Sequence, residues 1–333
     1  MRRLIGLCAA LALAFGALAP APARAEVKEL RIAIQPGVLF FPMWIMRESK
    51  LFEKNAARLG LGEIRTDWMT MTSGGANAEA LISGNVDVVV GGVSNLLVLW
   101  SKSKGAVKAF AGVTGVPNIL LTRDPNVKSI ADFSEKNRIA VPTVKMSLQA
   151  IFLQMALEKM YGEGGFKKLD ANMVQMGHAD STIALLDPRG HIDSHFSGPP
   201  FMQIAMKNPN VHAVAKSLDI IGEVTTSLAY TSTKFFAANP KTIEAFVAAL
   251  DEANELAKTD KRKAAEIYLA ATKEKVTVDE LVAIVSEPGT LLSSVPKGTM
   301  KFAEHMHKVG TLDRKPESWK EYFHENMHKA DGS

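Results

Sequence analysis

Cysteine is almost absent from the sequence, since Cys8 is the only one among 333 residues. It lies inside an apolar run, residues 4–19, which follows two arginines and precedes the sequence Ala23-Arg24-Ala25. A positive start, an apolar run and an A-x-A site are typical of a secretory signal peptide, so we expect residues 1–25 to be removed. The mature chain would then hold no thiol, which excludes a disulfide, a thiolate metal site and a cysteine nucleophile.

Long apolar runs and an excess of charge are also absent after the signal. No later stretch reaches the ~18 uncharged apolar residues that a membrane-spanning helix requires. The formal net charge of +4 falls to +1 without Arg2, Arg3 and Arg24, because 36 basic residues then face 35 acidic ones. A charge this small leaves no footprint for nucleic acid. We therefore expect a soluble, exported protein with no nucleic-acid partner.

The order of hydrophobic patterns predicts an α/β protein of about two domains. Alternating residues predict strands in KELRIAIQPG (28–37) and EIRTDWMTM (63–71), with a helix and a loop in between. A helix that stops at Gly84 and a short buried strand, VDVVVGG (86–92), come next. Because strands alternate with helices, we expect largely parallel sheets.

Further along, the sequence predicts another strand followed by a helix, and mainly helices over its last hundred residues. RIAVPTV (138–144) reads as a strand, and an apolar face predicts a helix over residues 148–161. Asn239-Pro240 is a typical helix start, and Thr277 with Glu280 has the spacing of a capping box. We interpret these last helices as scaffold.

A weak internal repeat links the two halves. The stretches WMTMTSGGANAEALISGNVDVVVGGVSN (from Trp68) and MVQMGHADSTIALLDPRGHIDSHFSGPP (from Met173) both run strand, small-residue turn, helix, glycine turn, aspartate, strand. In this alignment Asp87 corresponds to Asp193, and Asn85 corresponds to His191. Two similar strand–helix–strand units predict two similar lobes.

The stretch HIDSHFSGPPF (191–201) is the one place that suggests metal or catalytic chemistry. On a strand, His191, Asp193 and His195 would face the same side, as in a two-histidine, one-carboxylate iron site. The repeat argues against this, since its first copy lacks the histidine. A hydrolase is disfavoured because the sequence has no Gly-x-Ser-x-Gly elbow. We therefore interpret Asp193 as a turn-stabilising residue and His191 as a solvated one, and we expect no metal, no cofactor and no catalysis.

The polar and glycine-rich segments that follow the predicted strands define a binding site instead. In open α/β sheets, ligands bind beyond the carboxyl ends of the strands, and free N–H groups at helix starts favour an anion there. Asp180 is interpreted as the cap of its helix. The candidate ligand-binding residues are Gln35, Phe40, Phe41, Ser73, Gly74, Gly75, Ala76, Ser94, Asn95, Lys145, Ser147, His178, His195, Ser197 and Gly198.

These segments resemble the periplasmic solute-binding proteins of ABC importers, most closely the nitrate, sulfonate and taurine group, which also includes thiamine-pyrimidine binders. The resemblance covers nearly all of the mature chain. Its marks are IAIQPG with FPMWIMRESKLFEK, SGGANAEALISGNVDVVVGG, ADF…RIAVPT, HADSTIALLDPRGHIDSHFSGPPF and NPKTIEAFVAALDEA.

The resemblance implies a two-lobed periplasmic-binding-protein fold (type II, Venus-flytrap) with a hinge and a central cleft. Lobe one would comprise residues 26–114 plus 226–333, and lobe two residues 115–225. The protein would be a periplasmic monomer that captures a small organic anion, such as a sulfonate, taurine, nitrate or carboxylate, between its lobes. Its partners would be an ABC permease and its ATPase at the inner membrane.

Departures from the family pattern leave the solute open. Many members have Trp-Glu-Pro-Phe where this sequence has Gly198-Pro199-Pro200-Phe201, so the tryptophan and the carboxylate are missing. No arginine occurs at the predicted strand ends, which favours a singly charged or neutral solute over a doubly charged anion.

Four alternative functions follow from the same fold. A neutral or aromatic heterocycle such as a pyrimidine is the alternative solute, and a sensor or another type of importer is the alternative system. A pyrimidine-forming enzyme and the effector domain of a transcription regulator share the fold. The export signal disfavours both of these functions. The cysteine-free mature chain also disfavours the enzyme, and the lack of a basic patch also disfavours the regulator.

Overall fold

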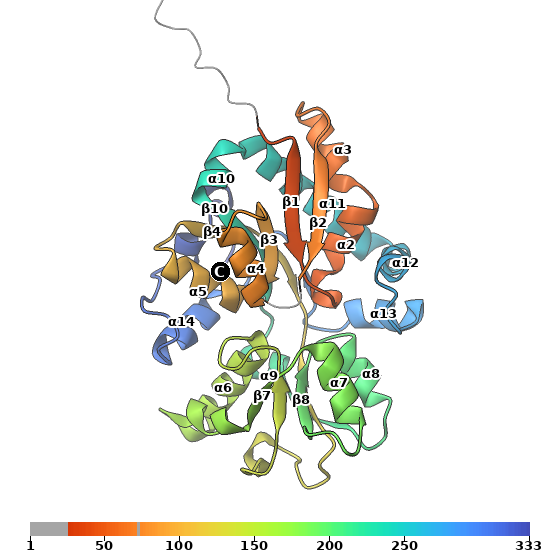
Figure 1. Cartoon of the computed structure of the whole chain (residues 1–333), viewed down its shortest axis with the longest axis vertical. Coiled ribbons are helices and arrows are strands. Elements are labelled where there is room, and N and C mark those ends of the chain that lie inside the picture. Colours follow the sequence, from red (N-terminus) through yellow and green to blue (C-terminus); the bar gives the residue numbers. More distant parts are fainter. Residues whose placement is uncertain (1–25, 72–73) are drawn as a thin grey trace, which may run out of the picture.

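The computed structural model describes residues 26–71 and 74–333 and contains two β-sheets, each with its own helices (Figure 1). Sheet one has the strand order β11-β4-β10-β3-β1-β2, and sheet two has the order β7-β6-β8-β5-β9. We call the part built on sheet one lobe one and the part built on sheet two lobe two. The expected signal peptide and the candidate Ser73 lie outside the described residues.

The strands of sheet one are β1 (Glu29–Ile34), β2 (Arg65–Thr70), β3 (Val88–Gly92), β4 (Val107–Gly115), β10 (Ser227–Ser232) and β11 (Leu291–Leu292). Those of sheet two are β5 (Ile119–Thr122), β6 (Ile139–Val141), β7 (Met173–Gln175), β8 (Ser194–Ser197) and β9 (His212–Lys216).

The helices of lobe one are α2 (Phe41–Glu48), α3 (Leu51–Arg58), α4 (Gly74–Ile82), α5 (Val93–Lys102), α10 (Thr233–Ala238), α11 (Pro240–Thr259), α12 (Lys261–Thr272), α13 (Val278–Val285) and α14 (Met300–Lys308). Those of lobe two are α6 (Leu148–Tyr161), α7 (His178–Leu186), α8 (Phe201–Met206) and α9 (Ser217–Ile221). The 3₁₀ turns are η1 (Val38–Phe40), η2 (Ile130–Asp132), η3 (Gly165–Lys167), η4 (Asp170–Asn172), η5 (Trp319–Tyr322) and η6 (Glu325–Met327).

The sheets are mixed, so the expectation of largely parallel sheets is wrong. In sheet one, β1 pairs in parallel with β2 and β3, but β10 is antiparallel to both β3 and β4. Sheet two repeats this arrangement, since β6 is parallel to β7 and β8 while β5 is antiparallel to β8 and β9. The antiparallel strands are those that carry the chain from one sheet to the other and back, and they must therefore run in opposite directions.

The prediction that the last hundred residues are mostly helical is confirmed, including its helix start signals. Helix α11 begins at Pro240, whose missing N–H costs nothing in the first turn of a helix. Helix α13 begins with the predicted capping box, in which the Thr277 hydroxyl accepts from the Glu280 N–H and Glu280 accepts from the Thr277 N–H. Side-chain acceptors thus satisfy N–H groups that the helix itself leaves free.

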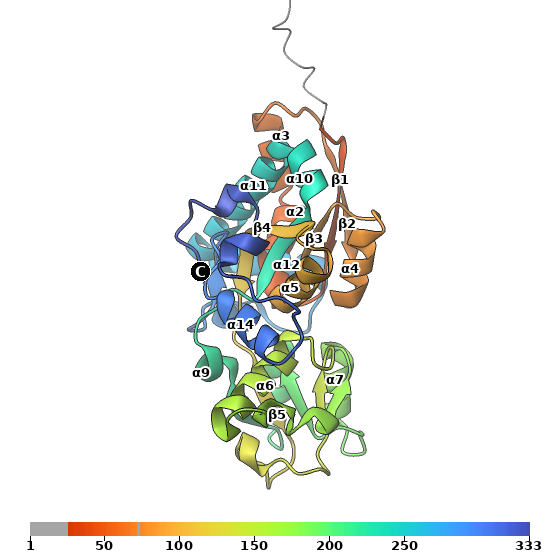
Figure 2. The ribbon, with the colours of Figure 1, turned by 90° about the vertical axis from the view of Figure 1, so that its left-hand side faces the viewer.

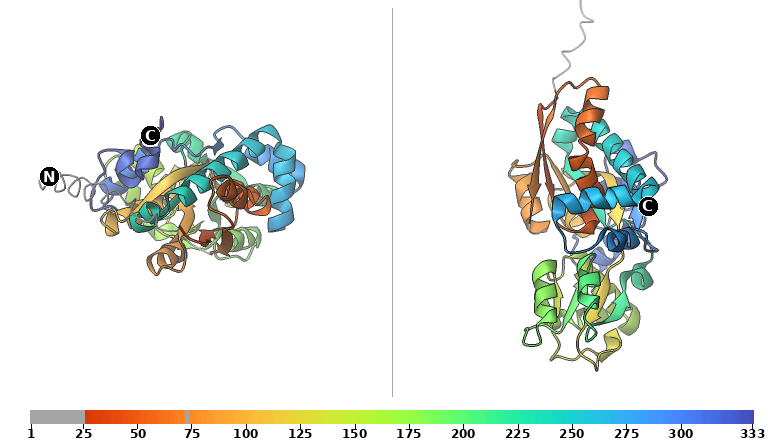
Figure 3. Two further views of the ribbon diagram at one scale, coloured as in Figure 1. Left: turned by 90° about the horizontal axis from the view of Figure 1, so that it is seen from above. Right: turned by 90° about the vertical axis from the view of Figure 1, so that its right-hand side faces the viewer.

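Both faces of sheet one are buried against helices. Leu30, Ile32 and Ile34 of β1 pack into a core with α2, α3, α11 and α12, whereas Ala33 belongs to the core formed with α5 and α14. This alternation is the period of a strand whose two faces are both covered. Figure 3 shows the helices on the two sides of the sheet from above. The second core continues into lobe two, where it includes Phe152 of α6.

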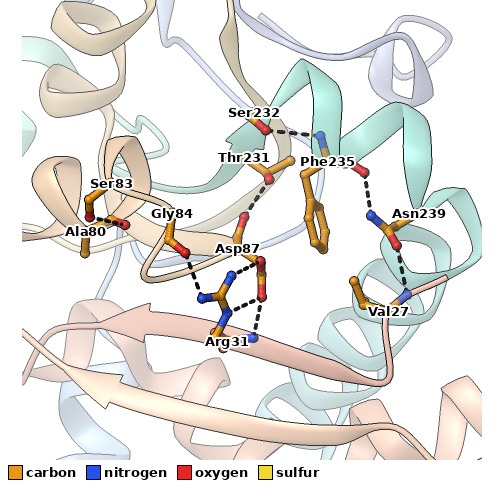
Figure 4. Close-up of polar contacts among 10 residues, drawn as sticks. All are labelled: Val27, Arg31, Ala80, Ser83, Gly84, Asp87, Thr231, Ser232, Phe235 and Asn239. Atoms are coloured by element: carbon orange, nitrogen blue, oxygen red, sulfur yellow. Dashed lines mark hydrogen bonds and ion pairs between the residues drawn. The ribbon is translucent and has the colours of Figure 1, made fainter.

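The internal repeat is real and rests on one aspartate in each copy. The units β2–α4–β3 and β7–α7–β8 each place their two strands on either side of a third strand, β1 or β6. Asp87 accepts hydrogen bonds from the backbone N–H and the guanidinium of Arg31, which also donates to Gly84 (Figure 4). Asp193 likewise accepts from the backbone N–H of Arg138, 2.8 Å away, so its predicted turn-stabilising role is confirmed.

The two lobes touch on three sides of the space between them. Helix α14 lies over α6 (Figure 2), where the rings of Phe302 and Phe152 are 5.8 Å apart and Lys308 pairs with Glu158 at 2.9 Å. Elsewhere, Lys207 of α8 in lobe two pairs with Glu280 of α13 in lobe one at 2.6 Å. At the third place, the Val38 N–H donates to the Pro199 carbonyl at 3.4 Å. The two lobes are therefore in direct contact beside the connections between them.

We expect Asp87→Ala to lower the free energy of unfolding by about 2 kcal/mol, because it leaves a backbone N–H and the Arg31 guanidinium without their acceptor. Urea unfolding of the mature protein measures this. The control is Asp251→Ala, which removes an exposed carboxylate from α11 and should change stability by less than about 0.5 kcal/mol. Equal effects of the two substitutions would contradict the role given to Asp87.

Candidate functional site

A cleft of about 600 Å³ separates the two sheets and is lined from both lobes. Its walls are the segments that follow the strands, as expected for an open α/β sheet. From lobe one the lining residues are Gln35, Pro36, Gly37, Leu39, Phe40, Gly74, Gly92 and Asn95. From lobe two they are Asn118, Pro142, Thr143, Ser147, Leu148, Gln149, Gln175, Met176, Gly177, His178, Ala179, Asp180, Gly198, Pro199 and Phe201.

Helices α4, α5, α6 and α7 start at this cleft. Gly74 begins α4, and the N-cap residues of α5, α6 and α7 are Gly92, Ser147 and Gly177, all of which line the cleft. The Ser147 hydroxyl accepts a hydrogen bond from the Ala150 N–H and so caps its own helix. Helix starts carry a partial positive charge and unpaired N–H groups, so they offer donors to a solute without a formal charge.

Seven of the candidate residues come together in the cleft. They are Gln35, Phe40, Gly74, Asn95, Ser147, His178 and Gly198. Gly74 is required by close packing, because a Cβ atom there would overlap the Asn95 amide. Asn95, on α5, thus lies directly against the start of α4 and joins two of the four helix starts.

Four other candidates are buried behind the cleft wall. Phe41 is fully buried against Tyr268, with ring centroids 5.2 Å apart. Ser94, His195 and Ser197 are also fully buried and do not line the cleft. They belong to the same segments as lining residues, and His195 contacts the lining residue His178.

The remaining described candidates lie outside the lining. Gly75 and Ala76 are in the first turn of α4, beyond the residue that borders the cleft. Lys145 is largely exposed, and its ammonium group pairs with Asp170 at 3.6 Å. Lys145 therefore adds no charge to the cleft in this arrangement.

Sequence reasoning missed several polar lining residues, above all Asn118 and Gln149. Asn118 immediately precedes β5, and Gln149 is the second residue of the predicted helix 148–161. Their signal is weak, because amides are common on surfaces and their role depends on partners about 30 residues away. Asp180 also lines the cleft. Its interpretation as a helix cap is wrong, since the N-cap of α7 is Gly177.

The cleft contains almost no formal charge. Among the lining residues within 26–71 and 74–333, none is a lysine or arginine, and His178 and Asp180 are the ionisable ones. The other polar side chains are five amides and two hydroxyls, namely Gln35, Asn95, Asn118, Gln149, Gln175, Thr143 and Ser147. Such a lining can bind a polar solute by hydrogen bonds, and it lacks the cations that a doubly charged anion would require.

His178 and His195 bind each other. Nδ1 of His178 is 3.0 Å from Nε2 of His195, and Nε2 of His178 is 3.3 Å from the Gln149 amide nitrogen. The His178 ring is also stacked on Phe201, at 5.6 Å between centroids and 14° between planes. Both nitrogens of His178 thus have partners. The rings of His178 and Phe201 form an aromatic wall on the lobe-two side of the cleft.

Burial keeps this histidine pair neutral. The protein surroundings lower the pKa of His178 to about 4. Burial, reinforced by the neighbouring His178, holds the pKa of His195 well below its usual range. Neither ring supplies a positive charge at neutral pH. The remaining histidine of the suspected metal site, His191, is exposed and lies before β8.

Comparison with known families identifies the chain. Residues 23–271 match the sequence model of the NMT1-like family, so the chain belongs to this family. Comparison of the sequence with curated proteins finds no significant match.

Solved structures agree on the fold. The alkanesulfonate-binding protein SsuA of Xanthomonas axonopodis pv. citri, bound to MOPS, superimposes with a TM-score of 0.71 at 17% identity, over 87% of this chain and 96% of that one. The periplasmic nitrate-binding protein NrtA of Synechocystis gives 0.67 at 13%, over 89% and 85%. A Candida albicans protein, CA3427, described as having the generic periplasmic binding protein fold, gives 0.69 at 10%, over 90% and 96%. The protein therefore has the two-lobed periplasmic-binding-protein fold, in its type II form with a hinge and a central cleft.

Within the described residues, no helix is long and apolar enough to cross a membrane. The same part of the chain contains no group of three or more His, Cys, Asp or Glu side chains placed to hold a metal ion.

The neutral histidines make stability depend on pH. Below pH 6.5 the unfolded chain binds protons at these positions, but in the folded protein His178 does not do so until about pH 4, and the pKa of His195 is also held well below its usual range. The free energy of unfolding should therefore fall as the pH is lowered from 6.5 toward 4. We expect the loss between pH 6.5 and 4.5 to be smaller in the double variant His178→Phe/His195→Met, by at least the ~2 kcal/mol that His178 alone contributes.

Urea unfolding of both proteins at pH 6.5, 5.5 and 4.5 measures this difference. Parallel pH profiles would mean that the folded protein also holds these protons, which contradicts a neutral pair.

Proposed function

We propose that this protein is the extracytoplasmic solute-binding component of an ABC importer. The proposal is carried by the cleft of about 600 Å³ between two lobes, which is lined by strand ends and helix starts from both. Membership of the NMT1-like family supports it, as do the structural neighbours described as sulfonate- and nitrate-binding proteins. The protein would bind a small solute without catalysis and deliver it to a membrane permease and its ATPase.

The solute class that best fits the lining is a small organic anion with a single charge. Four helix starts direct partial positive charge and N–H groups to one cavity. No lysine or arginine of the described lining adds a full charge, so a dianion would be poorly neutralised. A sulfonate or carboxylate group could accept from these N–H groups while its organic part contacts Phe40, Leu39 and Met176.

A neutral or aromatic heterocycle such as a thiamine-pyrimidine precursor is the second candidate. It is favoured by one observation, the stack of His178 on Phe201 at the cleft wall. A planar solute can extend such a stack, and the surrounding amides can both donate to it and accept from it.

Binding would work through closure of the lobes. We place lobe one at residues 26–114 plus 226–333 and lobe two at 115–225, because the chain passes between the sheets after β4 and before β10. A solute that contacts both lobes stabilises the closed state more than the open one, and this difference in affinity drives closure. Export by the signal peptide would place the protein, as a monomer, in the periplasm. A receptor for a sensor or another importer would have the same cleft; a permease and an ATPase encoded beside the gene would favour the ABC importer.

A thermal-shift screen of the protein from residue 26 onward tests this function. The panel holds sulfonates, small carboxylates, nitrate, pyrimidines and divalent metal ions. A solute at 100 times its dissociation constant adds about 2.7 kcal/mol, which should raise the midpoint by about 4 °C in a protein of this size. We expect a shift with one class of organic solute and none with the metals.

Two variants show whether a shift comes from the cleft. Ala179→Trp places a large ring in the lining and should abolish the shift. Ala171→Trp adds the same ring to an exposed site of lobe two outside the lining and should leave it unchanged. A shift that survives Ala179→Trp, or one caused by metals alone, would overturn the proposed function.

A further inference from the structure

A chain of hydrogen bonds starts at the junction of the lobes and ends inside lobe two. Its first acceptor is the backbone carbonyl of Val116, in the connection between β4 and β5. The side-chain nitrogen of Asn118 donates to this carbonyl at 2.9 Å. A carbonyl oxygen can only accept, so the orientation of the Asn118 amide is fixed, and its Oδ1 atom must be an acceptor.

The second amide takes its orientation from the first. Nε2 of Gln149 donates to Oδ1 of Asn118 at 2.8 Å, so the NH₂ end of the Gln149 amide faces this part of the chain. The same NH₂ group is 3.3 Å from Nε2 of His178. Because an NH₂ group only donates, Nε2 of His178 must be the nitrogen without a hydrogen, and the His178 hydrogen is on Nδ1.

The position of the hydrogen on His178 then determines its position on His195. Nδ1–H of His178 donates to Nε2 of His195 at 3.0 Å, which leaves the hydrogen of neutral His195 on Nδ1. Nδ1 of His195 is buried, and among the described residues it has neither a donor nor an acceptor as a partner. The two histidines alone would therefore allow either direction of the hydrogen bond between them. The amides of Asn118 and Gln149 determine which direction is adopted.

This series of hydrogen bonds leaves one acceptor of the described residues without a partner at the cleft, Oε1 of Gln149. Gln149 lines the cleft, and its Oε1 atom accepts no hydrogen bond from the described residues. Both nitrogens of His178 are already occupied. The Gln149 amide cannot rotate to offer its NH₂ group without losing two hydrogen bonds and placing Oε1 against Oδ1 of Asn118. On this wall the protein thus offers a carbonyl acceptor held in one orientation.

We propose that Gln149 is a specificity-determining residue, whose Oε1 accepts a hydrogen bond from an N–H or O–H group of the solute. This inference rests on the proposed function and narrows it, because it requires an organic solute that carries a donor group. The nearby Asp180 carboxylate, also in the lining, favours the same kind of group. A bare anion such as nitrate, which only accepts, would leave Oε1 unpaired in the closed cleft.

The hydrogen-bond direction can be measured without any solute. In the mature protein labelled with nitrogen-15, two-bond proton–nitrogen spectra distinguish a protonated from an unprotonated ring nitrogen. We expect the hydrogen of both His178 and His195 on Nδ1 at pH 7, and we expect Gln149→Met to remove this preference from His178. A hydrogen on Nε2 of His178 in the unsubstituted protein would overturn the chain. Gln154→Met is the control, since it makes the same change on α6 outside the cleft lining and should leave both rings as they are.

Solute selection is measured with pairs of equal charge and similar shape that differ in one donor. The pairs are glycolate and propionate, hydroxymethanesulfonate and ethanesulfonate, and aminopyrimidine and methylpyrimidine. In a pair that binds, calorimetry should give about tenfold tighter binding of the donor member, a preference lost in Gln149→Met and kept in Gln154→Met. Equal affinities in the unsubstituted protein, or an unchanged preference in Gln149→Met, would overturn the proposal. Failure of every solute in the earlier panel would instead contradict the proposed function, and the nitrogen spectra would still decide the direction of the chain.

Discussion

The antiparallel pairing of β4 with β10 is the constraint on which the arrangement of the lobes depends. The chain leaves sheet one after β4 and returns to it at β10, so residues 116–226 are held between the ends of these two strands. Thr226 donates to the Thr114 carbonyl at 2.9 Å, which ties the two connections together where they leave the sheet. Val116 and Asn118 follow β4 directly. The same pair therefore places the first polar groups of the cleft at a fixed point between the lobes.

The features that could be predicted from the sequence are the local ones. A strand such as β1 shows its period of two, a helix such as α13 shows its capping box, and the repeated aspartates show two similar units. Strand direction is different, because it depends on which distant strands pair. The residues of β10 look like those of any buried strand, and nothing in them reveals that their neighbours, β3 and β4, both run the other way. The expectation of largely parallel sheets failed for this reason.

The site shows the same limit at the level of single side chains. The segments that line the cleft could be found, because they follow strands and begin helices. Which residue of a segment faces the cleft depends on how its element packs: Phe40 lines the cleft while Phe41 is in the core, and Asn95 lines it while Ser94 is buried. The roles of Asn118 and Gln149 could not be predicted from the sequence. The role of an amide depends on its hydrogen-bond partner, and only the fold brings these two residues together.

The electrostatic character of the cleft follows from these packing details and limits what it can bind. The positive partial charge at the cleft comes from helix starts, where it is spread over several N–H groups, and from no lysine or arginine of the described lining, which does contain the carboxylate of Asp180. The histidines that might have added charge are buried and neutral, and their nitrogens are bound to each other and to Gln149. Partial charges can bind a singly charged anion, because its desolvation costs little free energy. They do not compensate the much larger free energy needed to desolvate a dianion. A cleft built in this way gains its affinity from hydrogen bonds in fixed directions, and so it distinguishes solutes by where their donors and acceptors lie more than by how much charge they carry.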